Sequence, residues 1–179
     1  THHHTLDEKL YLRIAVELYL KRLIVGGFPK VYEISKNFRN EGMDRSHNPE
    51  FTMLEFYQSF SDVYDIMDLT EKMLRSVSES IGASNVVFNN KTIDFKNKFS
   101  RLSMNDLMEQ EFGIKDIILD EKKIINIAEN LDLDMNLTSA TLLDKIFSLK
   151  IEPKLQNPTF VYDYPKSISP LSKVKRKQL

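Results

Sequence analysis

The sequence predicts an α+β fold, in which an antiparallel sheet is flanked by helices, and three observations lead to this prediction. Two neighbouring runs, 32–39 and 51–60, alternate polar and apolar residues with the period of two that strands require. Later stretches, between 61 and 150, place apolar residues at helical spacing. The chain has 179 residues, of which 41% are hydrophobic and 28% charged, which suits a globular domain with a sizeable core.

The first predicted helix lies close to the N-terminus. Thr5 and Glu8 have the spacing of a capping box, in which side chains bond the free backbone amides at the start of a helix. Residues at helical spacing follow it: Leu10, Ile14, Leu18 and Lys21. Gly26 and Gly27 end the segment, so we expect a helix from Thr5 to this glycine pair.

The two alternating runs predict a pair of strands. The even-numbered residues of the second run are mostly apolar, and we expect them to face a core: Thr52, Leu54, Phe56, Gln58 and Phe60. The odd-numbered residues have the composition of a ligand pocket: Phe51, Met53, Glu55 and Tyr57. If the runs pair antiparallel across the loop 40–50, Arg39 lies on this odd-numbered face. The pattern alone also fits an ordinary half-exposed hairpin.

The remaining elements follow from apolar spacing and from capping and turn residues. They are a helix over 63–81 capped by Ser61 or Asp62 and closed by Gly82, a hairpin over 86–95, helices between 103 and 150, and a strand over 158–164 stopped by Pro165. The C-terminal string SKVKRKQL is basic, and we interpret it as a solvated end in preference to an RNA contact.

Composition excludes several classes of protein. The net charge of −1 gives no overall attraction for a polyanion, so a nucleic-acid partner has to be bound by a local patch. The absence of cysteine excludes disulfides and thiolate metal sites. No apolar run reaches the roughly 18 residues of a membrane span, and the polar start does not resemble a signal peptide. We therefore expect a cytoplasmic protein without a membrane partner. We interpret His2–His4 as native residues and expect no metal site here.

Two strings in the strand region carry a family resemblance. FRNEG at 38–42 is followed by HNPEFTM at 47–53, and related strings flank them at 11–34 and 157–165. With these strings the chain closely resembles the class II lysyl-tRNA synthetases of the bacterial type, around the second class II signature. The resemblance covers essentially the whole chain and is weakest between 84 and 156. It implies a class II synthetase-like antiparallel sheet with a helical insertion.

The resemblance implies adenylate formation from an amino acid and ATP. Arg39 matches the catalytic arginine that holds the α-phosphate and the attacking carboxylate. Glu41 matches the residue that reads adenine, and Phe51 the ring stacked beneath it. His47 matches a loop residue that reaches the terminal phosphates. Family members commonly have arginine directly before this histidine, whereas Ser46 stands there in this chain and Arg45 lies one residue earlier. This departure leaves the role of Arg45 open.

Substrate choice is implied at the other end of the second strand. Glu55 and Tyr57 match the residues that grip the ε-ammonium group of lysine, and a buried carboxylate needs such a cation. The alternative is that Glu55 pairs with a lysine or arginine of this chain. Glu17 matches a residue that holds the α-ammonium group. Its alternative is a surface ion pair with Lys21, four residues later.

The chain looks like a truncated catalytic domain. We expect a catalytic-core part with the second signature over 1–102, a helical insertion over 103–155, and a return to the core sheet with a basic tail over 156–179. Nothing resembles the third signature, the acidic magnesium ligands or an anticodon-binding OB-fold. The expected parent is a homodimer acting on L-lysine, ATP and tRNA(Lys), with Mg²⁺ ligands outside this chain. We expect the chain alone to be inactive or very weak.

Two other functions remain open at this point. A paralogue that attaches a lysine-like group to elongation factor P shares both strings, although Gly42 favours the synthetase. A non-catalytic relative could keep the pocket for binding lysine or a nucleotide, yet such a protein has no need of Arg39.

Overall fold

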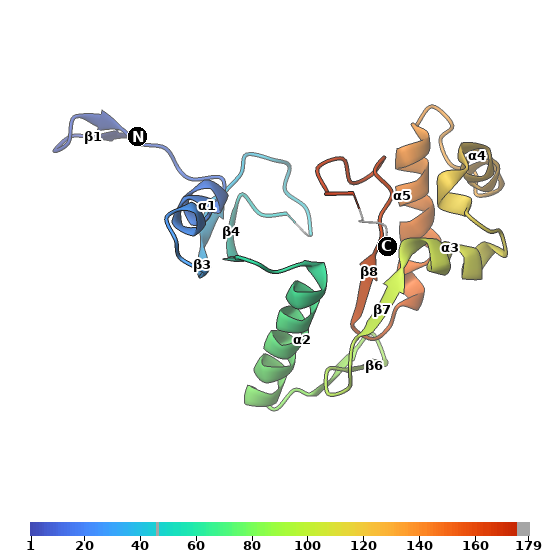
Figure 1. Cartoon of the computed structure of the whole chain (residues 1–179). Coiled ribbons are helices and arrows are strands. Elements are labelled where there is room, and N and C mark those ends of the chain that lie inside the picture. Colours follow the sequence, from blue (N-terminus) through green and yellow to red (C-terminus); the bar gives the residue numbers. More distant parts are fainter. Residues whose placement is uncertain (46, 175–179) are drawn as a thin grey trace. The chain divides into compact units, whose positions relative to one another are not determined.

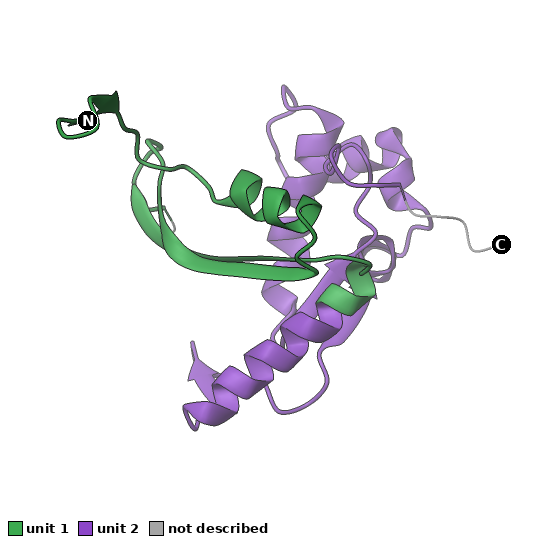
Figure 2. Ribbon diagram, turned by 60° about the vertical axis from the view of Figure 1, so that its left-hand side comes forward, with its two compact units in different colours: residues 1–66 green, residues 67–179 purple. Residues whose placement is uncertain are grey.

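A computed structural model describes residues 1–45 and 47–174. The chain divides into two compact units, residues 1–66 and 67–179 (Figure 2). The elements comprise both helices and strands, which confirms the predicted α+β class. Ser46, and the part of the predicted basic tail at 175–179, lie outside the described residues.

The structure corrects the start of the first helix. α1 spans Glu17–Val25 and does not begin at Thr5. Instead, β1 (His2–His3) pairs antiparallel with β2 (Glu8–Lys9), so Thr5 lies in the turn of a small hairpin. The capping-box spacing therefore does not start a helix, because the backbone at Glu8 pairs with another strand.

Residues 10–16, also expected to be helical, run without helix into α1. The amide of Phe38 donates a hydrogen bond to the Arg13 carbonyl oxygen at 2.9 Å. The Arg13 carbonyl oxygen is therefore bonded to a neighbouring strand. In a helix, the same group would be bonded within the helix itself.

The predicted strand pair is present. β3 (Lys30–Phe38) and β4 (Glu50–Gln58) are antiparallel, with Glu33 opposite Glu55 and Asn37 opposite Phe51. The odd-numbered side chains of both strands therefore share one face. Helix α1 packs on that face, because Lys21 Nζ lies 5.7 Å from the centre of the Tyr57 ring. Figure 2 shows the pair as a long curved hairpin with α1 beside it.

The even-numbered face of the hairpin is exposed, which contradicts the expectation that it faces a core. Tyr32 is 72% exposed, Ile34 64% and Leu54 38%. Helix α1 packs on the opposite face of the hairpin. Three apolar residues at even positions therefore lie at the surface of this chain, while Phe38 and Phe56 are half-buried.

The second unit follows the sequence prediction closely. Its elements are α2 (Val63–Ser80), whose first turn still belongs to the first unit, β5 (Asn85–Phe88), β6 (Lys91–Asp94), β7 (Ser100–Ser103), α3 (Met104–Phe112), η1 (Ile117–Leu119), α4 (Glu121–Asn130), α5 (Ser139–Lys150), η2 (Glu152–Lys154) and β8 (Thr159–Tyr162). Of the two candidate caps of α2, Asp62 accepts from the amides of Tyr64 and Asp65 at 2.8 and 3.1 Å. β5 and β6 form the predicted hairpin, with both turn asparagines at positive φ.

The core of the second unit lies among helices α3, α4 and α5. Figure 1 shows these helices gathered beside the β7–β8 pair. Fully buried residues come from all three helices and from the turn at Ile117: Met104, Met108, Ala128 and Ile146. Side chains of Ser103, Asp120 and Thr138 cap the three helices by accepting from amides of the first turn. β7 and β8 pair in parallel, so the intervening helices connect them as a crossover.

None of the helices in the described ranges is both long and apolar enough to pass through a bilayer.

Candidate functional site

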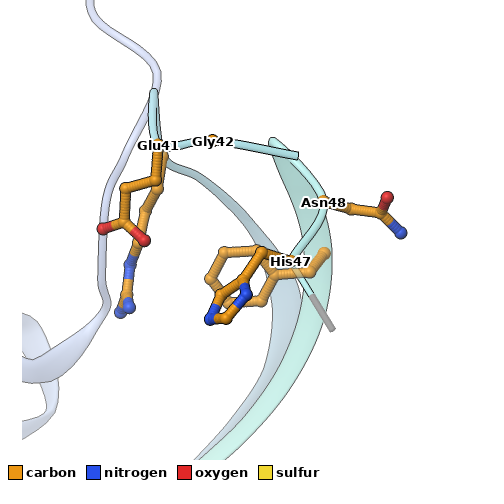
Figure 3. A pocket seen from close by; sticks show the side chains of 6 residues that line it. Glu41, Gly42, His47 and Asn48 are labelled. Atoms are coloured by element: carbon orange, nitrogen blue, oxygen red, sulfur yellow. The ribbon is translucent and has the colours of Figure 1, made fainter. Parts of the chain in front are cut away.

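A cavity of about 240 Å³ opens where β3 and β4 meet their connecting loop. Its lining consists of Arg39, Glu41, Gly42, His47, Asn48 and Phe51. The four residues that the sequence predicts to bind ATP (Arg39, Glu41, His47 and Phe51) are therefore together in one place. Figure 3 shows the side chains of Glu41 and His47 directed to the same side of the loop, while Asn48 points away.

Arg39 stands at the end of β3, and its side chain is held from two sides. The Arg39 amide donates to the Pro49 carbonyl oxygen at 2.9 Å, which continues the strand pairing beyond β3. Its Nε donates to the Ile14 carbonyl oxygen at 3.4 Å, and its Cζ lies 5.2 Å from the centre of the Phe51 ring. The bond to Ile14 uses Nε and leaves the two terminal nitrogens, Nη1 and Nη2, for an anion. The planar guanidinium group presents these nitrogens as a fork that binds carboxylates and phosphates.

His47 is fixed within the loop by Asp44. The His47 amide donates to Asp44 Oδ1 at 2.9 Å, and Nδ1 of the ring lies 2.9 Å from the same oxygen. The Asp44 amide in turn donates to the His47 carbonyl oxygen at 3.2 Å. With Nδ1 bound to a carboxylate, Nε2 is the ring nitrogen that remains for a ligand.

The predicted lysine-binding residues form a second group on the same face of the hairpin. The Tyr57 hydroxyl donates to Glu55 Oε1 at 2.5 Å. Burial raises the pKa of Tyr57 well above its ordinary value, and the hydrogen bond to Glu55 and the charges of Glu55 and Glu17 raise it further. Tyr57 is thus half-buried and lies beside the carboxylate of Glu55.

No basic side chain of the described residues forms an ion pair with Glu55. Within the described residues, Glu55 is therefore not paired with a lysine or arginine of this chain, which was the alternative to a role in binding the substrate. Its carboxylate keeps an oxygen that the Tyr57 hydroxyl does not use, so an ammonium group can still bind there.

Glu17 is the third predicted contact of the amino acid. It pairs with Lys21 four residues later, which is the ordinary surface pair that the sequence left open. The pair also lies beside the pocket, since Lys21 Nζ is 5.7 Å from the centre of the Tyr57 ring. A ligand ammonium group at Glu17 would thus compete with Lys21.

Polar atoms between the two groups lack protein partners. Ser35 and Asn37 lie on the odd-numbered face of β3, and Asn37 is completely buried. Neither side-chain atom of Asn37 has a hydrogen-bond partner among the described residues, and the same holds for Ser35 Oγ. Because buried polar groups are nearly always satisfied, this stretch is suited to contact with a polar ligand or with water.

Sequence reasoning missed one ion pair on this face. Arg13 Nη1 lies 2.6 Å from Glu33 Oε1, and Arg13 Nε donates to the Lys36 carbonyl oxygen at 2.9 Å. The sequence could have placed Glu33 on this face, because Glu33 and Arg39 are both odd-numbered residues of the same alternating run. Arg13 could not, because the helix expected at this position would have directed it elsewhere.

The arrangement joins sites for two kinds of charge on one strand surface. Arg39 and His47 offer nitrogen donors for an anion beside the Phe51 ring. Glu55 and Tyr57 offer oxygen atoms for a cation, four and six positions further along β4 from Phe51. The face can therefore hold an elongated ligand that is anionic at one end and cationic at the other.

Comparison with known proteins agrees with this chemistry. The sequence model of the class II tRNA synthetases (D, K and N) matches residues 1–179. A lysine–tRNA ligase of Clostridium kluyveri is 49% identical over 183 residues, and one of Staphylococcus saprophyticus is 47% identical over 177 residues. These alignments cover 98% and 97% of this chain and 36% of each relative. The chain thus spans about a third of the length of the relatives that it matches, and it belongs to the family of class II tRNA synthetases (D, K and N).

Proposed function

We propose that this chain provides the nucleotide and amino-acid contacts of a lysine–tRNA ligase, which activates L-lysine with ATP to lysyl-adenylate and transfers it to the 3′ end of tRNA(Lys). One observation carries the proposal. Glu55, bonded to Tyr57 and without a basic partner in the described residues, shares a strand face with the cavity of Arg39 and Phe51. The names of the relatives support the same reaction.

Activation requires two anions to approach, because the carboxylate of lysine attacks the α-phosphate of ATP. Arg39 is placed to hold both, since its planar fork can bond two oxygens and its charge offsets their repulsion. Phe51 offers a ring for stacking the adenine base, and Glu41 lines the same cavity. His47 would present Nε2 to the terminal phosphates. The protein thus contributes positioning and charge, which is the main requirement of phosphoryl chemistry.

Specificity for lysine would come from Glu55 and Tyr57. Glu55 accepts the ε-ammonium group, and Tyr57 orients the carboxylate through its hydroxyl. A site built around this charge rejects norleucine, because norleucine leaves the carboxylate unpaired. It repels aspartate, since like charges would meet at Glu55. Glu17 would hold the α-ammonium group of lysine in place of its present partner Lys21.

Several further assignments form part of the proposal. The partners are L-lysine, ATP and tRNA(Lys), the parent protein is a homodimer, and the compartment is the cytoplasm. No group of three or more acidic or histidine side chains in the described ranges is placed to hold a metal ion. The proposal assigns no residue and no step to the Mg²⁺ that accompanies ATP. Residues 103–155, which contain helices α3, α4 and α5, would form a helical insertion in the catalytic domain.

Calorimetric titration with a non-hydrolysable lysyl-adenylate analogue tests the proposal. We expect the chain to bind this analogue and to bind the aspartyl analogue at least tenfold more weakly. Glu55→Gln should weaken the binding of the lysyl analogue by about 2 kcal/mol, because a hydrogen bond between two charged groups is lost. The control is Gln58→Glu, which changes the charge of the same strand on its even-numbered face. It should leave the affinity for the lysyl analogue unchanged. Equal binding of both analogues, or full binding by the Glu55 variant, would contradict the assignment.

A further inference from the structure

Two carboxylates face each other across the strand pair near the proposed lysine site. Glu33 of β3 is directly opposite Glu55 of β4, and both lie on the odd-numbered face. Residues directly opposite in an antiparallel pair have Cβ atoms about 5 Å apart, and like charges at this spacing are destabilising. Both side chains are only partly buried. Left alone, the two carboxylates would repel each other and would share a proton more readily than isolated groups do.

Arg13 removes this conflict. Its Nη1 lies 2.6 Å from Glu33 Oε1, and its Nε donates to the Lys36 carbonyl oxygen at 2.9 Å. Its own carbonyl oxygen accepts from the Phe38 amide at 2.9 Å. The guanidinium group is therefore fixed by a backbone bond and a side-chain bond at the same time, which holds it at Glu33.

We propose that Arg13 is a specificity-determining residue, because it neutralises Glu33 and leaves Glu55 as the carboxylate that meets the side chain of the substrate. The pocket then offers one negative charge to one ammonium group. The inference rests on the proposed function, since it concerns how the same site selects lysine. Arg13 acts through Glu33 and contacts neither reacting group.

The other charged or titratable groups on this face each have a partner of their own. From α1, Glu17 is paired with Lys21, which lies near the Tyr57 ring. From β4, the Tyr57 hydroxyl is bound to Glu55. Directly after β3, Arg39 lies over the Phe51 ring at the opposite end of the face. Arg13 is thus the cation of the described residues that forms an ion pair with Glu33.

Removing Arg13 should make lysine binding depend on pH. In Arg13→Gln, we expect Glu33 and Glu55 to take up a shared proton as the pH falls, and the ammonium group must displace this proton. We expect the affinity for lysine to fall about threefold or more from pH 8 to pH 6, with proton release on binding. The unaltered chain, and Arg22→Gln as a matched control on the far part of α1, should show a flat profile.

Two more variants separate charge from structure. Glu33→Gln leaves Arg13 without its partner and beside Glu55, so lysine should bind at least threefold more weakly at every pH. Arg13→Gln combined with Glu33→Gln removes both charges, and both the affinity and the flat profile should return. A role of Arg13 that is only structural predicts that the double variant is no better than Arg13→Gln, and that result would overturn the proposal.

Titration of the carboxyl groups by NMR gives a test without any ligand. With ¹³C-labelled glutamate, Glu55 should titrate as one member of a coupled pair with Glu33 in Arg13→Gln, and without this coupling in the double variant, in which residue 33 is no longer a carboxyl group. Identical titration of Glu55 in these two variants would overturn the role of Arg13. If the unaltered chain bound no lysine although the carboxyl groups behaved as expected, the proposed function would fail and the neutralising role of Arg13 would stand.

Discussion

The two compact units differ in how they are held together. Of the sixteen buried apolar residues in the described ranges, only Val16 and Leu20 belong to the first unit. The second unit contains the continuous core around Met104, Met108 and Ile146. The first unit relies on the β3–β4 hydrogen bonds and on polar side-chain contacts such as those of Arg13 with Glu33 and Tyr57 with Glu55.

The unit with the smaller core carries the candidate site. Every residue proposed to touch lysine or ATP lies between 17 and 57, within the first unit. Substitutions in the second unit should therefore change the free energy of unfolding, and those in the first should change ligand affinity. Four predictions can break or sharpen this division.

The largest effect is expected in the core of the second unit. Leu142→Ala removes a side chain that is 1% exposed and packs in the α3–α5 core. We expect a loss of about 3 kcal/mol in the free energy of unfolding, from lost burial and the cavity left behind. Leu149→Ala, on the same helix but 56% exposed, should change it by less than about 0.5 kcal/mol. Urea denaturation followed by circular dichroism measures both, and equal losses would contradict the division.

Arg39→Ala should have the next largest effect, on binding alone. The variant loses the guanidinium fork over Phe51, so we expect affinity for a non-hydrolysable ATP analogue to fall by about 2 kcal/mol. Affinity for free lysine should fall less, because Arg39 would hold only the carboxylate of lysine while Glu55 and Tyr57 hold its ε-ammonium group, and the urea midpoint should change little. Calorimetric titration with each ligand separates these outcomes.

Tyr57→Phe should cost about 1 kcal/mol of lysine affinity, the usual worth of one hydrogen bond. It also allows a test by pH. The pKa of Tyr57 is raised by burial and by Glu55, so its neutral form contributes stability below about pH 10 that is lost as the pH rises through the raised value. Alkaline titration at 295 nm should give the same absorbance rise up to about pH 11 for both proteins. A smaller rise in the variant would show that Tyr57 ionises normally.

The last prediction concerns helix capping, in which α1 of the first unit and α4 of the second unit differ. Val16 gives α1 no side-chain cap, whereas Asp120 accepts from the amides of Lys122 and Lys123 at the start of α4. Asp120→Ala should lower the free energy of unfolding by about 1 kcal/mol. Asp120→Asn keeps an acceptor and should retain most of it. Thermal denaturation of both variants checks the difference, and an equal loss would point to the charge of Asp120 instead of its cap.

Periodicity predicted most of the second unit and the strand pair. The stripe from Val63 to Ile81, the asparagine turn and the three later helices all appear, since local spacing decides elements that pack against a core. Alternation also predicted the shared face of Arg39 and Phe51. The fold and the candidate site could both be reached from these patterns together with the two family strings.

Pairing between distant segments explains what the sequence could not predict. Residues 10–16 have helical spacing, yet Arg13 bonds to the backbone of β3 more than twenty residues away. The parallel pairing of β7 with β8 likewise joins segments separated by three helices. Capping-box and spacing rules describe only neighbours in sequence, so neither contact leaves a local pattern.

The register of β3 and β4 has a consequence for how this gene can change. A single-residue deletion within either strand would turn every following side chain to the opposite face and move Glu55 or Arg39 away from the ligand. Changes in the length of the loop 40–48 leave the two strands in phase, yet they would displace Glu41 and His47 from the cavity that these residues line. Functional sequences should therefore keep the lengths of both strands and of the loop between them.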